Sequence, residues 1–342
     1  TMVRWEIAHP PSPVPADVDD AMWYARMPPF SSPPLRVCET VPAAAGTDFV
    51  QLKGIQRKLS SSALTLSLGT CSKLDGTLFG ALPLRRFDAS ALMPSVLEIG
   101  DSAISDCAFL ESVCLSGLSH VKTIGHVVLC NNPCLRTISM PTMAALTRVG
   151  HHFANRCEQL ACVEFPAQAP ELVDVGRDFL AATPALRTVS VKGFTALATV
   201  PVGWFFHTGV DTCPIPSGAL VLTGSFCCGC DHVREPDLGG LENTVAIGDH
   251  FFESCASLQA IDLSPLRSLD AIGPHALQEC AALARVSGFD RLHRVMRIDE
   301  HFLHGAVALQ EVSLTGMDAL RSIGPSCFFG CRALRYVRVS NL

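Results

Sequence analysis

Hydrophobic and polar positions repeat with a period of about 25 residues along most of this chain. The pattern Ile-Gly-x-x-Phe-x-x-x-Cys-x-x-Leu-x-x-Ile-x-Leu starts at Ile247 and returns, with substitutions, at Ile272, Ile298 and Ile323. A repeat of this length predicts a solenoid that grows by stacking one short unit, in place of two or three globular domains. Earlier units begin at Ile99, Ile124, Val149, Val175 and Val200.

Each unit contains one segment with the alternation of a short β-strand. In the segment Val312-Ser313-Leu314, the two apolar residues are expected to face the core and the serine to face outward. Stacked units would then form a continuous parallel sheet. The glycine after each leading Ile predicts a turn that needs a permissive backbone. The phenylalanines that follow are expected to fill the core under a short helical or 3-10 turn: Phe153, Phe179, Phe251 and Phe302.

The pattern divides the chain into two parts. Residues 1–63 are rich in proline and lack the repeat, so they are expected to form either a cap on the first coil or a docking segment. Residues 64–342 are expected to form a solenoid of nine or ten units. Its irregular stretch, residues 201–246, is interpreted as a single unit with two insertions, and two shortened units are the alternative.

Composition excludes several classes of protein. The chain is 48% hydrophobic and 17% charged, which argues against overall disorder. Its net charge is −6 and it has no Lys/Arg-rich run, so we expect no nucleic-acid binding. No run of 18 apolar residues occurs, so no transmembrane segment is expected. Known nucleophile, phosphate-loop and zinc-protease motifs are absent, so we expect neither enzymatic activity nor a cofactor.

The sixteen cysteines fall into two groups. Those that share one repeat position are expected to be buried free thiols, which favours a reducing, cytoplasmic location; a secreted or surface location is the alternative if the N-terminus is truncated. Near Cys213, the run Cys227-Cys228-x-Cys230-x-His232 is compatible with a disulfide or with zinc, although its spacing fits zinc poorly. The shared-position cysteines are Cys107, Cys157, Cys255, Cys280 and Cys331.

Histidines also share one repeat position. His250, His275 and His301 occur in three consecutive units, and His152 matches them in an earlier unit. Such a stack can bind Zn²⁺ or respond to pH, whereas the simpler interpretation is a row of half-exposed surface histidines. We therefore predict no metal site.

The pattern that starts at Ile247 resembles the BspA-type (Treponema pallidum-type) leucine-rich repeat, which carries a similar Ile-Gly…Phe…Cys…Leu…Ile signature. The resemblance covers roughly residues 64–342 and weakens over 201–246. It implies an α/β fold: a curved leucine-rich-repeat solenoid with a parallel β-sheet on the concave face and short helical or 3-10 turns on the convex face. Members of this family include bacterial surface adhesins and many protist proteins, mostly with binding roles. The resemblance implies no catalytic residues.

The outward positions of the predicted strands are the candidate binding surface, because solenoids commonly bind partners on their concave side. Tyr and Arg are favoured at such surfaces. We expect a non-enzymatic scaffold that binds a protein partner through this sheet and residues 201–246; the alternative is a cell-surface or secreted adhesin. The candidate binding residues are Glu164, Asp262, Arg285, Glu311, Tyr336 and Arg338.

Overall fold

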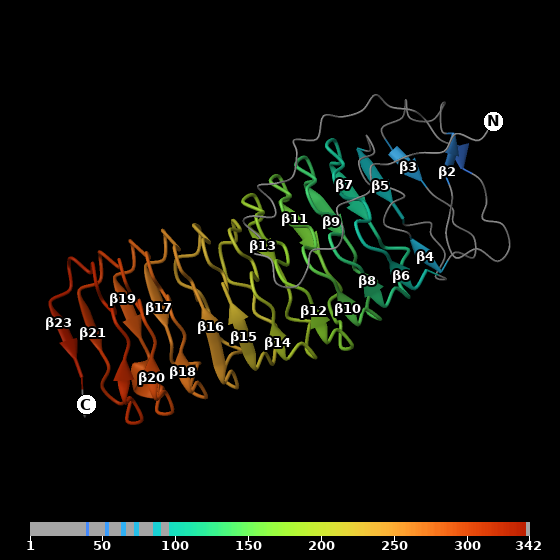
Figure 1. Ribbon diagram of the computed structural model, residues 1–342. Helices are drawn as coiled ribbons and strands as arrows, with labels where there is room; N and C mark the ends of the chain where they lie inside the picture. The colour runs from blue at the N-terminus through green and yellow to red at the C-terminus, as the bar shows by residue number, and fades with distance from the viewer. Residues whose placement is uncertain are drawn as a thin grey trace. The chain divides into compact units, whose positions relative to one another are not determined.

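The repeat units form the coils of a solenoid, as Figure 1 shows in a computed structural model. The structure describes residues 39–40, 52–54, 63–65, 72–74, 85–89 and 96–339, all within the unit Cys38–Leu342. The proline-rich flank, residues 1–63, lies outside these residues except for β1 (Glu39–Thr40), β2 (Leu52–Gly54) and the first residue of β3. The expectation of a cap or docking segment therefore stays a prediction.

The predicted strand is present in the described units outside residues 201–246, and these strands pair in parallel within three successive sheets. We call these strands together the Val ladder. Their central residues pair from coil to coil, as in Val113 with Ile138 and Val286 with Ile261, and most of them are buried while most of their neighbours are exposed. The strands are β3 (Ala63–Thr65), β5 (Arg86–Asp88), β7 (Ser112–Cys114), β9 (Thr137–Ser139), β11 (Cys162–Glu164), β13 (Thr188–Val189), β17 (Ala260–Asp262), β19 (Arg285–Ser287), β21 (Glu311–Ser313) and β23 (Tyr336–Arg338).

A second set of parallel strands, which the sequence pattern did not predict, forms three further sheets and contains the leading Ile, Val or Leu of each unit. We call it the Ile-Gly ladder. Most of its strands have only two residues: a polar residue that is partly or fully exposed and a buried Ile or Val. A strand of two residues is too short to show a period-two pattern in the sequence. Its strands are β4 (Lys73–Leu74), β6 (Glu98–Ile99), β8 (Thr123–Ile124), β10 (Arg148–Val149), β12 (Asp174–Val175), β14 (Thr199–Val200), β15 (Val221–Gly224), β16 (Ala246–Asp249), β18 (Ala271–Ile272), β20 (Arg297–Ile298) and β22 (Ser322–Ile323).

The glycine after the leading Ile has a different role from the one predicted. Gly125, Gly150 and Gly273 do not have the positive φ that a permissive turn would require. A Cβ at Gly150 would lie only 2.5 Å from the backbone carbon and oxygen of Gly125 in the preceding coil. These glycines therefore allow adjacent coils to approach closely.

The third side of each coil is not helical, contrary to the expected helical or 3-10 convex turns. Among the described residues there is no α-helix, and the only 3-10 segment is η2 (Phe289–Arg291). Left-handed residues alternate along this side, as at His250 (φ 59°), Phe252 (φ 51°) and Ser254 (φ 55°). Their backbone groups bond to adjacent coils: Phe252 N–H donates to Phe226 O at 3.0 Å. Hydrogen bonding between coils takes the place of the bonding within a helix.

The core is a continuous column of apolar side chains enclosed by the three sides. Its widest part is aromatic: Phe179 stacks on Trp204 with ring centroids 4.9 Å apart and on Phe153 at 5.7 Å. All three rings are fully buried. The predicted role of the repeated phenylalanines as core residues is therefore confirmed.

Residues 201–246 form two coils, so the favoured interpretation of one unit with two insertions is wrong. β15 pairs with β14 on one side and β16 on the other, and Leu222 therefore occupies the leading position of its own coil. Leu222 follows Val200 by 22 residues and precedes Ile247 by 25, so one coil is short and the next has the usual length. Leu222 does not match the Ile-Gly pattern, because the residue after it is Thr223 and not glycine.

Candidate functional site

The predicted binding residues lie on the exposed surface of the Val ladder. Arg285 and Tyr336 share one row of the sheet with Glu311, which pairs directly with Tyr336. Asp262 and Arg338 belong to the other row, next to Ser287 and Ser313 respectively. These five residues are brought together on β17 to β23. Glu164 lies apart from them on β11, where its Oε2 accepts a hydrogen bond from Ser139 Oγ at 2.6 Å.

Asp262 is held as a carboxylate by hydroxyl and amide donors. Partial burial tends to raise its pKa, but hydrogen bonds outweigh this effect and leave the pKa below its usual value. Ser264 donates through its backbone N–H at 3.1 Å and its Oγ at 2.8 Å, and Ser287 Oγ donates at 3.3 Å. The carboxylate therefore presents a fixed negative charge beside the Arg285 row.

An open depression in the surface, which the sequence pattern did not reveal, adjoins this part of the Val ladder. Gln259 N–H donates to Arg234 O at 2.8 Å, and Ala284 N–H donates to Gln259 O at 2.9 Å, so Glu235 continues the row of Ala260 and Arg285, with Arg234 next to it. Glu235 Oε1 lies 3.9 Å from Arg285 Nη2. The sequence feature that could have predicted its position is the spacing of 25 residues from Glu235 to Ala260 and again from Ala260 to Arg285. The depression is lined by Asp211, His232, Arg234, Glu235, Ser257 and Gln259.

A column of histidines lies on the third side of the coils. The rings of His250 and His275 stack with centroids 4.8 Å apart, and those of His275 and His301 stack at 4.9 Å. All three are partly exposed, as expected, and all have φ 59°. The alignment follows from the register of the coils, because equivalent left-handed residues project their side chains in the same direction.

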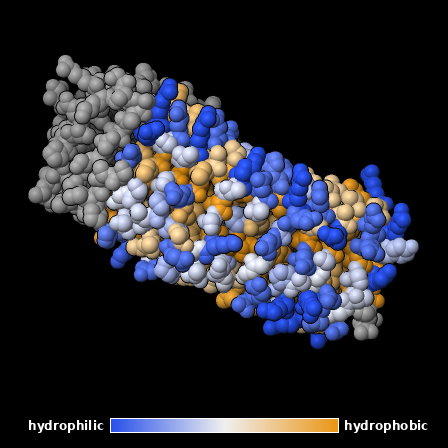
Figure 2. Space-filling model, turned by 180° about the vertical axis from the view of Figure 1, so that it is seen from behind, coloured by the Kyte–Doolittle hydropathy of each residue, from blue (hydrophilic) through white to orange (hydrophobic). Residues whose placement is uncertain are grey.

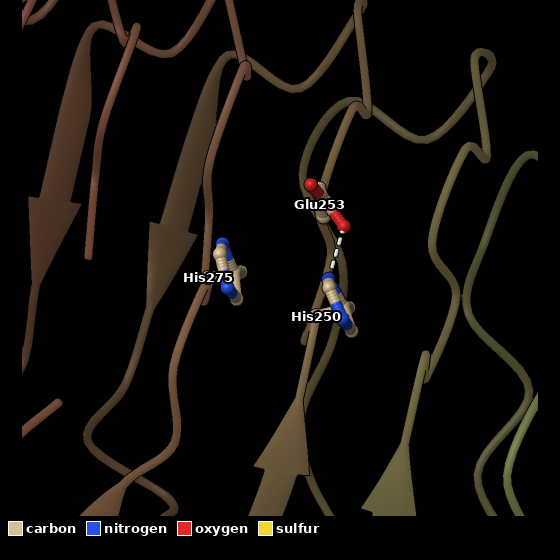
Figure 3. Close-up of side chains that lie close together, drawn as sticks. All are labelled: His250, Glu253 and His275. Atoms are coloured by element: carbon tan, nitrogen blue, oxygen red, sulfur yellow. Dashed lines mark hydrogen bonds and ion pairs between the residues drawn. The ribbon is translucent and has the colours of Figure 1, made fainter. Parts of the chain in front are cut away.

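A second column runs beside these histidines, three residues further along each coil. Glu253 Oε2 lies 2.5 Å from His250 Nδ1, as Figure 3 shows, and Gln278 Oε1 accepts from His275 Nδ1 at 2.7 Å. In the next coil His304 Nδ1 lies 3.4 Å from His301 Nδ1. The repeat pattern of the histidines did not reveal this second column, because it concerns only the position of the histidines in each unit and not the position three residues later.

The sequence profile of the BspA-type leucine-rich repeat region matches six copies in this chain, over residues 76–189 and 223–342. The chain belongs to the BspA-type leucine-rich repeat family. Such families are typically protein-interaction or surface proteins and are generally non-enzymatic. The profile omits residues 190–222, the stretch that contains the short coil.

Solved structures of leucine-rich repeat proteins match this chain at low sequence identity. A leucine-rich repeat protein from Bacteroides ovatus is 16% identical with a TM-score of 0.41, over 89% of this chain and 94% of that one. A leucine rich cell surface protein from Faecalibacterium prausnitzii is 16% identical (TM-score 0.38; 89% and 93%). The Treponema pallidum leucine-rich repeat protein is 15% identical (TM-score 0.28; 89% and 91%). A comparison with curated proteins finds no match.

The cysteines of the BspA-type units are buried thiols, as expected. Cys157, Cys255 and Cys280 each donate from Sγ to a carbonyl 28 residues earlier, at 3.0–3.1 Å. Burial raises the pKa of Cys157 and Cys280 to about 12. Cys107 is also buried, whereas Cys331 is only partly so. These thiols are neutral and structural.

The cysteine cluster of residues 213–230 contains a disulfide between Cys213 and Cys227. Cys228 and Cys230 are free and buried. Of the two alternatives, the structure therefore favours the disulfide, because Cys227 is no longer available as a zinc ligand. The bond joins the two coils formed by residues 201–246.

The exposed surface of the solenoid is not uniformly polar. Figure 2 shows one side, where apolar residues are visible along the middle and hydrophilic residues along the margins. Val173, Leu220 and Val245 are large apolar residues with 62%, 43% and 39% exposure, and each precedes a leading residue of the Ile-Gly ladder by two positions. No helix among the described residues is long and apolar enough to cross a membrane.

Proposed function

We propose that this BspA-type solenoid binds a protein partner through the exposed Val ladder of its C-terminal coils and the adjoining depression. The observation that carries this proposal is the continuity of the two: the row that contains Ala260 and Arg285 extends directly to Glu235, and Arg234 precedes Glu235 in the chain. One surface therefore includes both the predicted strand residues and the irregular coils. Concave curvature toward this surface is part of the proposal.

The residue types on this surface suit protein recognition. Tyr336 is 62% exposed on β23, with Arg338 two residues further on, and Arg285 is exposed two strands away. Tyr and Arg supply a large share of binding energy at protein interfaces. Asp262, Glu235 and Glu311 place negative charge among them, so a partner of mixed charge is expected.

The backbone that displays these residues is held by ladder hydrogen bonds, between β17 and β19 and between β21 and β23, which lowers the entropic cost of binding. Glu164 lies on the same ladder but apart from this cluster, and we propose that it is peripheral. Non-enzymatic function and absence of nucleic-acid binding also belong to the proposal, supported by the family and by the net charge of −6.

Photo-crosslinking tests which surface meets the partner. A photoreactive amino acid at position 336 should crosslink to a discrete protein in extracts of the native source, whereas the same amino acid at the exposed position of Val173 should not. Crosslinking of that protein from position 173 alone would contradict the proposal. The described strands place position 336 on the Val ladder and position 173 next to the Ile-Gly ladder, so the two positions sample different surfaces.

A cell-surface or secreted adhesin remains the second candidate, and the Cys213–Cys227 disulfide favours it because such bonds persist in oxidising compartments. The scaffold hypothesis is instead supported by the buried free thiols. Mass spectrometry of protein from the native source, alkylated before and after reduction, separates the two. Labelling of Cys213 and Cys227 only after reduction supports the adhesin, and labelling without reductant under denaturing conditions supports an intracellular scaffold.

A further inference from the structure

The paired columns on the third side of the coils bring together side chains that are suited to binding a metal ion. The stacked rings of His250, His275 and His301 direct their Nδ1 edges toward the neighbouring column in each coil, as the contacts with Glu253, Gln278 and His304 show. We call these six residues the paired columns. They lie on a different side of the coils from the Val ladder, so a metal site there is independent of the proposed binding surface.

We propose that His250, Glu253 and His275 bind a divalent transition-metal ion of the zinc class between two adjacent coils. One ligand atom from each of the three residues lies within 4.8 Å of the other two, and Figure 3 shows both rings and the carboxylate on the same side of the coils. Among the described residues this is the only group of three or more such side chains with that property.

The geometry requires a modest adjustment of the side chains. Zinc bonds to histidine nitrogen or carboxylate oxygen are about 2.0–2.2 Å long, so two ligand atoms of a tetrahedral site are about 3.3–3.6 Å apart. The most widely separated ligand atoms must therefore approach each other by at most about 1.5 Å. The His250 and Glu253 side chains are 39% and 18% exposed, and His275 is partly exposed, so the rings can tilt without disturbing the core.

The ligand chemistry fits the ion. Two imidazole nitrogens and a carboxylate oxygen form a His₂Glu set, which zinc accepts with a fourth position left to water. When the ion binds through His250 Nδ1, it takes the place of the hydrogen bond to Glu253 Oε2, and the neutral imidazole carries its proton on Nε2. The neighbouring thiol of Cys228 lies 3.9 Å from Glu253 Oε2, but it does not belong to the group of side chains whose ligand atoms lie within 4.8 Å of one another, so it is outside the proposed ligand set.

The other histidines are arranged for different roles. His126 Nδ1 and His151 Nδ1 each accept a backbone N–H at 3.0 Å, from His151 and Arg177 respectively, so these atoms are not available to a metal. His152 is buried, with its Nδ1 3.3 Å from Asp178 Oδ2. His301 and His304 form a pair without a third ligand that meets the same distance condition among the described residues.

The alternative is that the paired columns only stabilise the coils through hydrogen bonds. The next coil suggests a substitution that separates this structural role from metal binding. Gln278 bonds to His275 in the place where Glu253 meets His250, so Glu253→Gln preserves the hydrogen-bonding pattern and removes the anionic ligand. Zinc titration by calorimetry on the full chain should show one saturable site in the wild type. Glu253→Gln and His275→Gln should each bind at least about tenfold more weakly.

His304→Gln is the matched control, because it lies in the same column one coil beyond the proposed site. It should retain wild-type zinc affinity, and Co²⁺ bound in place of zinc should show no thiolate-to-metal charge-transfer band. Zinc should also raise the Tm of the wild type and of His304→Gln but not of Glu253→Gln. The proposal is overturned by the absence of saturable binding, by wild-type affinity in Glu253→Gln, by loss of binding in His304→Gln, or by a thiolate band.

Discussion

Asn132 occupies a position that cysteine fills in several of the other coils, and its contacts show what that position must provide. Its Nδ2 donates to Ile104 O at 2.8 Å and to Leu129 O at 2.7 Å, and its Oδ1 accepts Cys107 N–H at 2.8 Å. Cysteine supplies one of these donors through its thiol, as Cys157 Sγ does to Leu129 O at 3.1 Å. The repeated requirement is therefore a small buried donor to the preceding coil.

Replacement of Asn132 should reveal this requirement. Asn132→Ala leaves Ile104 O without this donor and Cys107 N–H without this acceptor, and should lower the free energy of unfolding by at least about 2 kcal/mol. Asn132→Cys restores one donor and should cost less than Asn132→Ala. Urea unfolding monitored by circular dichroism measures both variants. An equal cost for the two would show that the position requires volume and not a donor.

His152 should make stability depend on pH. Burial, followed by Arg177 and His151, lowers its pKa to about 4, so the ring is neutral in the folded protein and its contact with Asp178 is a hydrogen bond, not an ion pair. The unfolded chain takes up the proton near pH 6.5. The contribution is therefore complete above about pH 6.5 and falls by about 3 kcal/mol as the pH decreases toward 4.

The measurement is urea unfolding of the wild type and His152→Asn between pH 4 and 7.5. Asparagine tolerates the left-handed backbone of this residue (φ 59°), which makes it the suitable replacement. The wild type should lose more stability on acidification than the variant. The same loss in both would rule out His152 as the group responsible.

At the scale of the elements, the close approach of adjacent coils depends on the glycines of the Ile-Gly ladder. Gly150→Ala places a Cβ 2.5 Å from the Gly125 backbone and should lower the free energy of unfolding by about 1–3 kcal/mol. Gly224→Ala is the control, because the nearest atom to its Cβ is 3.6 Å away and its φ is not positive. Thermal unfolding should show a lower Tm for the first variant and little change for the second; a similar effect in both would contradict this role.

The sequence predicted the elements whose periodicity is visible over several residues. The three-residue strands, the outward rows that contain Arg285 and Tyr336, and the buried cysteine column all follow from alternation and repeat spacing. The Ile-Gly ladder was missed because a strand such as Arg148–Val149 is too short to alternate. The left-handed third side was missed because its conformation depends on hydrogen bonds from the adjacent coil, which no local pattern encodes.

The candidate sites show the same limit. Glu253 lies three residues after His250, at the same offset as Gln278 from His275, and this regularity could have revealed the paired columns. The depression near Glu235 could have been located in the same way, because Glu235 lies in the coil of usual length and precedes Ala260 by 25 residues. Disulfide pairing of Cys213 with Cys227, by contrast, depends on how the two coils of residues 201–246 stack.

At the scale of the whole molecule, the Val ladder, the Ile-Gly ladder and the paired columns are different sides of coils that share one buried core. Substitutions of exposed side chains on the Val ladder leave that core intact and should therefore not affect the Ile-Gly ladder or the paired columns. This independence allows binding by one surface to be tested with substitutions on another as controls, without loss of the fold.

The central claim is that the partner binds the C-terminal Val ladder, and the most direct test is the dissociation constant of the crosslinked partner for two variants. Combined Arg285→Ala, Tyr336→Ala and Arg338→Ala should weaken binding at least about thirtyfold, as expected when hot-spot residues are lost. Combined Leu220→Ser and Val245→Ser, on the exposed apolar row beside the Ile-Gly ladder, should leave it unchanged. Loss of binding in the second variant together with wild-type affinity in the first would contradict the claim.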